Sequence, residues 1–101
     1  MYRIVWEYEA QPERLAEFED VYGPEGRWAA FFQRSHDYLG TELFRSTTAP
    51  AHFVLVDVWK SRVAYEAFRR AHADDYAALD ESCQQLRTRE RTLGMSDDGK
   101  T

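Results

Sequence analysis

The chain has 101 residues, which is enough for one domain and too few for two independent cores. Its 13 lysine and arginine residues stand against 18 aspartate and glutamate residues, so the net charge is −5 and no basic block exists for nucleic acid or an anionic membrane. No apolar run approaches the roughly 18 residues that span a bilayer, and no signal-peptide core follows Met1, so we expect a cytoplasmic protein.

The first half of the chain predicts three strands and one interrupted helix. Residues 2 to 9 alternate between large apolar and mostly polar side chains, which is the period of a strand. From residue 12 to about residue 35 a helical spacing of aromatic residues is interrupted by Gly23-Pro24-Glu25-Gly26, so we expect a broken or bent helix. Residues 38–45 indicate a second strand, and residues 52–59, which are apolar on both faces, indicate a central one.

The second half predicts another helix and a last strand. Ser61 can cap a helix that continues in two halves to about residue 85. Residues 86–95 indicate a charge-rich strand, and residues 96–101 a polar tail. The resulting β-α-β-β-α-β order predicts an α+β, ferredoxin-like domain over residues 1–95. Its four-stranded antiparallel sheet should have the order 4-1-3-2, with the helices on one face.

This sheet order places the last strand beside the first. Arg87, Arg89 and Arg91 would then lie across from Glu7 and Glu9, unless these charges simply face water.

One face of the predicted sheet has no helix to cover it. The central strand is apolar on both sides, with Val54, Val56 and Val58 on one and Phe53, Leu55 and Trp59 on the other. A bare face of this kind is near or above the largest apolar patch that monomers usually expose. We therefore expect a homodimer that packs sheet against sheet, the alternative being an open sheet with a hydrated outer face.

Three segments resemble the antibiotic biosynthesis monooxygenase family: Gly40-Thr41-Glu42-Leu43, Val58-Trp59-Lys60-Ser61 and Ala64-Tyr65-Glu66-Ala67-Phe68. With the element order, the resemblance runs from about residue 2 to residue 95 and implies a dimeric α/β barrel. The family includes cofactor-independent monooxygenases that act on polycyclic phenols and quinols, haem-degrading enzymes, and members without a known activity.

The haem-degrading branch is the less favoured relative. A resemblance to that branch implies a site made of a Trp and a His in the second long helix and an Asn in the first strand. The Trp position falls on Phe68, His72 lies earlier than the branch's His, and the chain contains no Asn.

The resemblance to the cofactor-independent branch suggests an aromatic pocket with His72 as its base. On a continuing helix His72 shares a face with Phe68, and an imidazole can take a phenolic proton. The expected walls of the substrate pocket are Trp28, Phe32, Trp59, Tyr65 and Phe68. The role of His72 as the base requires that its side chain faces inward beside a cavity of at least ~300 Å³. The alternatives are a surface kink at His72 and aromatic side chains that only pack the core.

The other reactive residues carry weaker predictions. Asp57 should enter the apolar layer with Leu55 and Trp59, and it then needs a partner or a raised pKa. Arg45 on the neighbouring strand is a candidate partner, and a structural ion pair is favoured over a catalytic acid.

Two histidines and one cysteine remain. His36 and His52 lie at element boundaries and should be solvated, and their spacing matches no metal site. The lone Cys83 can form no internal disulfide and should be a half-buried thiol.

Three functions remain open from the sequence. The first is oxygenation of a small aromatic molecule without metal, flavin or other cofactor. The second is a non-catalytic module that binds a small apolar ligand, and the third is haem handling with altered residues.

Overall fold

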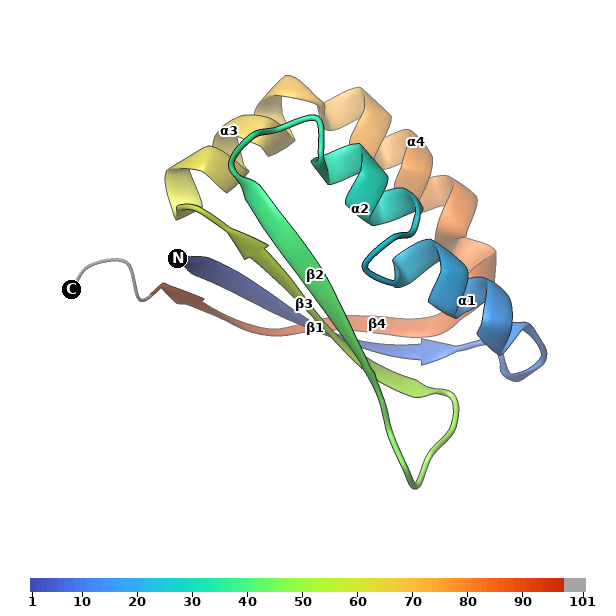
Figure 1. Ribbon diagram of the computed structural model, residues 1–101. Helices are drawn as coiled ribbons and strands as arrows, with labels where there is room; N and C mark the ends of the chain where they lie inside the picture. The colour runs from blue at the N-terminus through green and yellow to red at the C-terminus, as the bar shows by residue number, and fades with distance from the viewer. Residues whose placement is uncertain (98–101) are drawn as a thin grey trace.

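The computed structural model describes residues 1–97; the predicted tail therefore lies outside the described residues from residue 98 onward. The elements in chain order are β1 (Tyr2–Ala10), a 3-10 turn (Pro12–Arg14), α1 (Leu15–Tyr22), α2 (Arg27–Phe32), β2 (Tyr38–Arg45), β3 (His52–Trp59), α3 (Arg62–Ala71), α4 (Ala73–Cys83), a second 3-10 turn (Gln84–Leu86) and β4 (Arg87–Asp97). The strands form one antiparallel sheet in the order β2-β3-β1-β4, and the helices cover one face of it (Figure 1). This confirms the predicted fold and sheet order.

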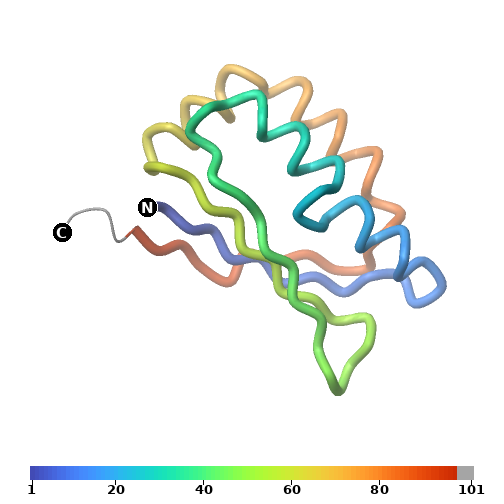
Figure 2. The backbone as a smooth tube through the Cα atoms, viewed as in Figure 1, coloured from blue at the N-terminus to red at the C-terminus, as the bar shows by residue number. Residues whose placement is uncertain are grey.

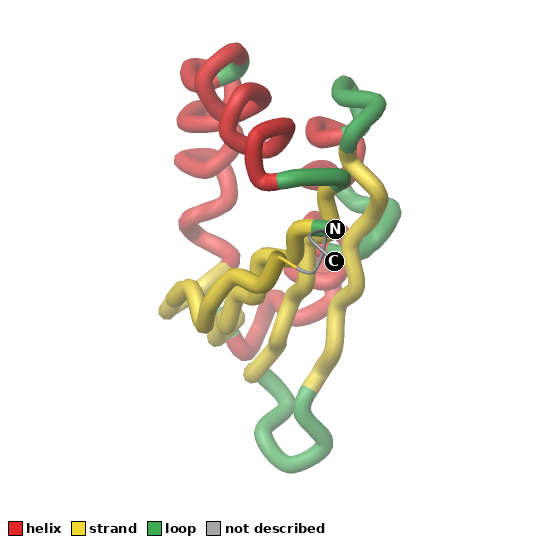
Figure 3. Tube along the Cα trace, turned by 90° about the vertical axis from the view of Figure 1, so that its left-hand side faces the viewer, coloured by secondary structure: helices red, strands yellow, loops and turns green. Residues whose placement is uncertain are grey.

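The middle of the sheet holds the first strand and the third. β1 pairs with β3 on one side and with β4 on the other, so Tyr2 lies opposite Asp97 and the start of the chain runs beside the end of β4 (Figure 2). Turned by a quarter, the molecule shows the helices gathered on one side of the strands and the β2–β3 hairpin projecting away from them (Figure 3). Within residues 1–97, no helix is long and apolar enough to cross a membrane.

The first predicted helix is broken where the glycines lie. α1 ends at Tyr22 and α2 begins at Arg27. A Cβ atom on Gly26 would lie 2.3 Å from the carbonyl oxygens of Asp20 and Val21, so no larger residue fits this close turn. The two short helices can therefore follow the curve of the sheet.

The second predicted helix is also divided. The Ser61 hydroxyl accepts a hydrogen bond from the Ala64 N–H at 3.1 Å, which confirms the predicted cap. α3 ends at Ala71, and His72 leaves helical geometry with φ −120° and ψ 31° before α4 begins. His72 thus lies at the junction of two helices.

Side chains of β3 alternate strictly between the two faces. Phe53, Leu55, Asp57 and Trp59 are buried under the helices, whereas the residues between them are half-buried. The core is dominated by rings that touch one another, including Phe18, Tyr22, Phe32, Phe53 and Trp59. The helix-covered face is therefore largely aromatic.

β4 departs from the prediction in two ways. It continues through Asp97, two residues beyond the predicted end. A register shift between Glu9 and Ala10 also turns Arg87 to the helix side. There Arg87 donates to the Tyr22 hydroxyl at 2.6 Å and to Asp80 at 3.0 Å, so its predicted position opposite Glu7 and Glu9 was wrong.

Cys83 also differs from its prediction. It is fully buried at the end of α4 rather than half-buried, and it is a free thiol.

Candidate functional site

A small cavity lies between the helices and the covered face of the sheet, and we call it the helix-side cavity. The space open to the centre of a water molecule is about 20 Å³, which is room for one or two waters. All its lining side chains are buried except Trp6 and Tyr76, which are half-buried. The lining residues are Trp6, Tyr8, Tyr22, Trp28, Phe32, Thr41, Leu55, Asp57, Tyr65 and Tyr76.

Asp57 is the charged member of this lining. It is 6% exposed, and its Oδ1 accepts a hydrogen bond from the Thr41 hydroxyl at 2.7 Å. Burial raises the pKa of the Asp57 carboxyl to about 6, although hydrogen bonds from Thr41 and Trp6 lower it in part. This carboxyl therefore titrates close to neutral pH.

Thr41 reaches Asp57 because the two residues are paired across β2 and β3. Arg45, the predicted partner, lies at the far end of β2 opposite Phe53. It binds Glu19 at 3.2 Å and the Pro50 carbonyl at 3.1 Å. The prediction of an Asp57–Arg45 ion pair was therefore wrong, and neutral donors hold the carboxylate instead.

A third hydroxyl extends this contact. The Tyr38 hydroxyl is hydrogen-bonded to that of Thr41. Because the Thr41 hydrogen is donated to Asp57, Thr41 must accept from Tyr38. Asp57, Thr41 and Tyr38 thus form a directed chain from the cavity toward the half-buried Tyr38 ring.

The other polar groups of the cavity are neutral. Burial raises the pKa of Tyr8, Tyr22, Tyr65 and Tyr76, so their hydroxyls stay protonated at neutral pH. The indole N–H of Trp28 is buried and has no hydrogen-bond partner among residues 1–97. The cavity thus combines one carboxylate with an unused donor in an aromatic wall.

The sequence-predicted site residues divide into two groups. Trp28, Phe32 and Tyr65 line the helix-side cavity. Trp59 is fully buried and Phe68 is 5% exposed; both pack in the core and neither lines the cavity. Trp59 also buries an indole N–H without a partner.

His72 lies apart from the cavity. Its ring is half-buried, with its centroid 4.4 Å from that of Phe68 and 6.1 Å from that of Phe31. It is not among the lining residues, and the cavity is far smaller than the ~300 Å³ that its role requires. His72 as the base stays a prediction, and the carboxylate that does face the cavity is Asp57.

Sequence reasoning missed Trp6, Thr41 and Tyr76 as members of this site. The signal that could have identified Thr41 was the pairing of β2 with β3. Once the hairpin register is known, Thr41 falls opposite Asp57 on the buried face.

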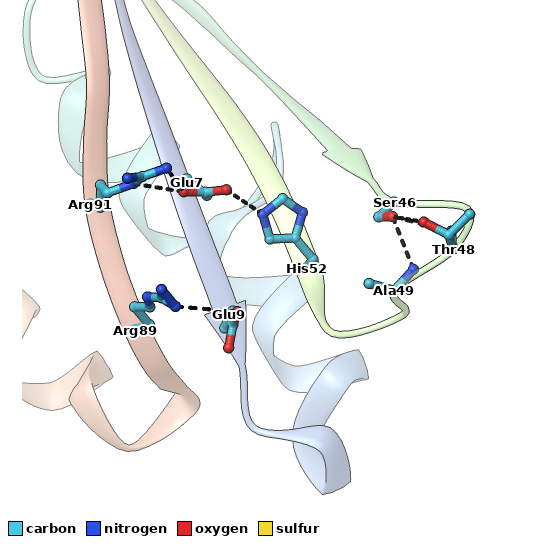
Figure 4. Close-up of polar contacts among 8 residues, drawn as sticks. All are labelled: Glu7, Glu9, Ser46, Thr48, Ala49, His52, Arg89 and Arg91. Atoms are coloured by element: carbon cyan, nitrogen blue, oxygen red, sulfur yellow. Dashed lines mark hydrogen bonds and ion pairs between the residues drawn. The ribbon is translucent and has the colours of Figure 1, made fainter.

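The uncovered face of the sheet carries a different set of groups, and we call it the open face. Glu7 binds His52 Nε2 at 2.6 Å and Arg91 at 2.7 Å, and Arg89 lies 3.7 Å from Glu9 (Figure 4). These hydrogen bonds, that from His52 foremost, hold the pKa of Glu7 below its usual range. The cross-strand pairs of Arg89 and Arg91 are confirmed.

The histidines on the strand and loop edges differ from each other. His52 is half-buried and paired with Glu7, so the prediction of a solvated side chain was wrong there. His36 is exposed, as expected. Within residues 1–97, no three His, Cys, Asp or Glu side chains are grouped so as to hold a metal ion.

Comparison with known proteins gives one family and several similar structures. The profile described as antibiotic biosynthesis monooxygenase matches residues 1–81. SnoaB, a cofactor-independent oxygenase from Streptomyces nogalater, is 27% identical with a TM-score of 0.75, over 99% of this chain and 94% of that chain. A candidate antibiotic biosynthesis monooxygenase from Bordetella bronchiseptica is 21% identical with a TM-score of 0.71, over 95% of this chain and 94% of that one. No curated protein matches the sequence significantly.

Proposed function

Because the chain belongs to the antibiotic biosynthesis monooxygenase family, we propose that it is a cofactor-independent monooxygenase that oxygenates a phenol- or quinol-like molecule in the helix-side cavity. The observation that carries this proposal is a buried carboxylate, Asp57, in an otherwise aromatic cavity. Apolar walls with few polar groups suit a flat ring that must be oriented. The likeness to SnoaB supports the type of chemistry.

The reaction needs a base and molecular oxygen. A base takes the proton of the substrate hydroxyl, which leaves an electron-rich anion. This anion transfers electrons to O2, and a carbon–oxygen bond forms to give a hydroperoxide. Loss of water then leaves one oxygen atom in the product as a carbonyl. The substrate supplies both hydrogens and both electrons, so no external reductant is consumed.

Substrate entry requires movement of the lining. A single aromatic ring fills a cavity of about 150 Å³, whereas the cavity here has room for only one or two waters. Trp6 on β1 and Tyr76 on α4 are its half-buried members. We assign the entrance to these two side chains, which must move aside when a ring enters.

Oxygen uptake tests the proposed function. Purified protein is supplied with hydroquinones and anthrone-type phenols in the presence of a chelator, with heat-denatured protein as the control. Isotopically labelled O2 should leave one labelled atom in the product. Uptake equal to the control for every phenol, together with tight binding of a phenol, would favour the non-catalytic ligand-binding alternative.

We also propose that a second copy of the chain covers the open face. Val5, Val54, Val56 and Val58 are half-buried there although none of the helices within residues 1–97 lies over them. The charges that flank them have both signs, with Glu7 and Glu9 beside Arg89 and Arg91, so the face can meet a copy of itself.

A matched pair of variants tests this dimer. Val56→Asp places a charge in the open face, and Val63→Asp places the same charge on α3 at a side chain that is 73% exposed. Sedimentation should show a dimer for wild type and Val63→Asp, and a dissociation constant raised by about 100-fold or more for Val56→Asp. A monomeric wild-type protein would contradict the proposal.

A further inference from the structure

We propose that Asp57 is the base of this reaction and that its carboxylate takes the proton of an aromatic hydroxyl bound in the helix-side cavity. The inference rests on the proposed function and deepens it. In the step, the O–H bond of the substrate breaks and its electron pair stays on the substrate oxygen. A new O–H bond forms on Asp57, and the proton later leaves with the water released from the hydroperoxide.

The first support is the position of the carboxylate. Asp57 lines the cavity and is 6% exposed, so a molecule in the cavity meets it without bulk water between them. Its hydrogen-bond donors are the neutral groups of Thr41 and Trp6. An ionised carboxylate has about four acceptor sites, so these donors leave it able to accept a proton.

The second support is that, in the part of the chain that the structure describes, no other lining side chain is a base near neutral pH. The titratable groups that face Asp57 from the other elements are tyrosines, namely Tyr8, Tyr22, Tyr65 and Tyr76, with Tyr38 behind Thr41. Burial raises the pKa of each, so none is a base near neutral pH. His52 is bound to Glu7 on the open face, and His72 packs against Phe68.

Thr41 and Tyr38 act as positioning residues. Thr41 donates to Asp57 and accepts from Tyr38, and the Tyr38 ring packs against Phe32 and Trp59 at centroid distances of 5.5 and 5.4 Å. The directed chain of hydroxyls therefore fixes one carboxylate oxygen of Asp57. The other oxygen, Oδ2, is not engaged by this chain of hydroxyls.

The opposite wall narrows the substrate class. Trp28 comes from α2 and buries an indole N–H without a partner, whereas Asp57 comes from the sheet. A molecule that bonds Asp57 and also reaches the Trp28 N–H once the lining has moved carries a hydroxyl donor at one end and an oxygen acceptor at the other. A hydroxylated aryl ketone or a quinol has this pattern, whereas a hydrocarbon has not.

The catalytic test compares Asp57→Asn with Asp20→Asn, the same change at an exposed site on α1. Wild type and Asp20→Asn should lose kcat/KM as pH falls through the pKa of about 6. Asp57→Asn should lose this acid limb and at least about 100-fold in kcat, with KM raised by only about three- to tenfold. If wild type is active and Asp57→Asn keeps the wild-type pH profile, the inference is overturned and the proposed function stands. An inactive wild type would remove both.

A binding arm shows whether Asp57→Asn keeps an intact site. Under nitrogen, 4-hydroxybenzophenone and its methyl ether are titrated while tryptophan fluorescence is followed. Wild type should prefer the phenol by about tenfold, and the variant should bind the ether unchanged while the preference falls to about threefold or less. Loss of ether binding in the variant, or an equal preference in both proteins, would contradict the role of Asp57. Inactivation by His72→Ala with full activity in Asp57→Asn would assign the base to His72.

Discussion

The two faces of the sheet are made by the same strands, yet their carboxylates behave in opposite ways. On the helix-covered face, burial raises the pKa of Asp57 to about 6. On the open face, hydrogen bonds from His52 and Arg91 keep the pKa of Glu7 below its usual range. Both residues lie on central strands, so the strand does not decide their chemistry. What decides it is whether the neighbouring groups are neutral rings or charged partners.

The same contrast applies to the apolar side chains. Phe53 is fully buried beneath the helices, whereas Phe44 on the paired strand points to the open face and is 53% exposed. One face is already packed in a single copy of the chain, and the other has room for a partner. The same substitution should therefore have different effects on the two faces.

Truncation of an aromatic ring should give the largest difference between the faces. Phe53→Ala opens a cavity in contact with Phe18 and should cost about 3–5 kcal/mol of unfolding free energy. Phe44→Ala should cost less than about 1 kcal/mol at concentrations where the chain is monomeric. Urea denaturation measures both. Equal losses would mean that the open face is as well packed as the covered one.

Removal of the buried charge should give a smaller and pH-dependent effect. The pKa of Asp57 rises from 3.8 in the unfolded chain to about 6 in the folded one, so wild-type stability falls as pH rises through this window. Asp57→Asn lacks this loss. Between about pH 4 and about pH 8 the difference in unfolding free energy should shift in favour of the variant by about 2.5 kcal/mol.

Paired urea titrations of wild type and Asp57→Asn at the two pH values measure this shift, with Asp20→Asn as the control. A constant difference between wild type and Asp57→Asn would show that the carboxyl is not perturbed. A catalytic group that destabilises the fold is a common compromise between activity and stability.

Removal of a charge from the open face should give the smallest effect and the opposite sign. Because the folded-state pKa of Glu7 is lowered, its contribution is present above the unfolded pKa and is lost as pH falls through the folded one. Glu7→Gln should therefore be slightly less stable than wild type at neutral pH and equal to it in acid. Added salt should shrink the difference, since the partners Arg91 and His52 are partly exposed. A stability difference between wild type and Glu7→Gln that grows in acid would contradict the lowered pKa of Glu7.

Much of the fold follows from local patterns in the sequence. Local patterns define most of the elements: the alternation in β1 and β3, the glycines at 23 and 26, and the cap at Ser61. The order of these elements predicts the strand order of the sheet. These signals are local, because each depends on residues a few positions apart.

The candidate site could be predicted only in part, because its geometry depends on register and bends. Thr41 and Arg45 lie on the same face of β2, and only the length of the β2–β3 turn decides which of them meets Asp57. The bulge that turns Arg87 inward is likewise set by pairing with β1. The helix break at His72 fixes the direction of its ring, and spacing along one continuous helix could not supply it.

The site of aromatic binding is tested most directly by NMR, in which the three indole N–H resonances are followed while 4-hydroxybenzophenone is added without oxygen. If the substrate site is the helix-side cavity, the signals of Trp6 and Trp28 should shift, whereas the side-chain methyl signals of Val54, Val56 and Val58 on the open face should stay in place. A response confined to the open face, or to the residues around His72, would contradict binding of the aromatic molecule on the helix-covered side.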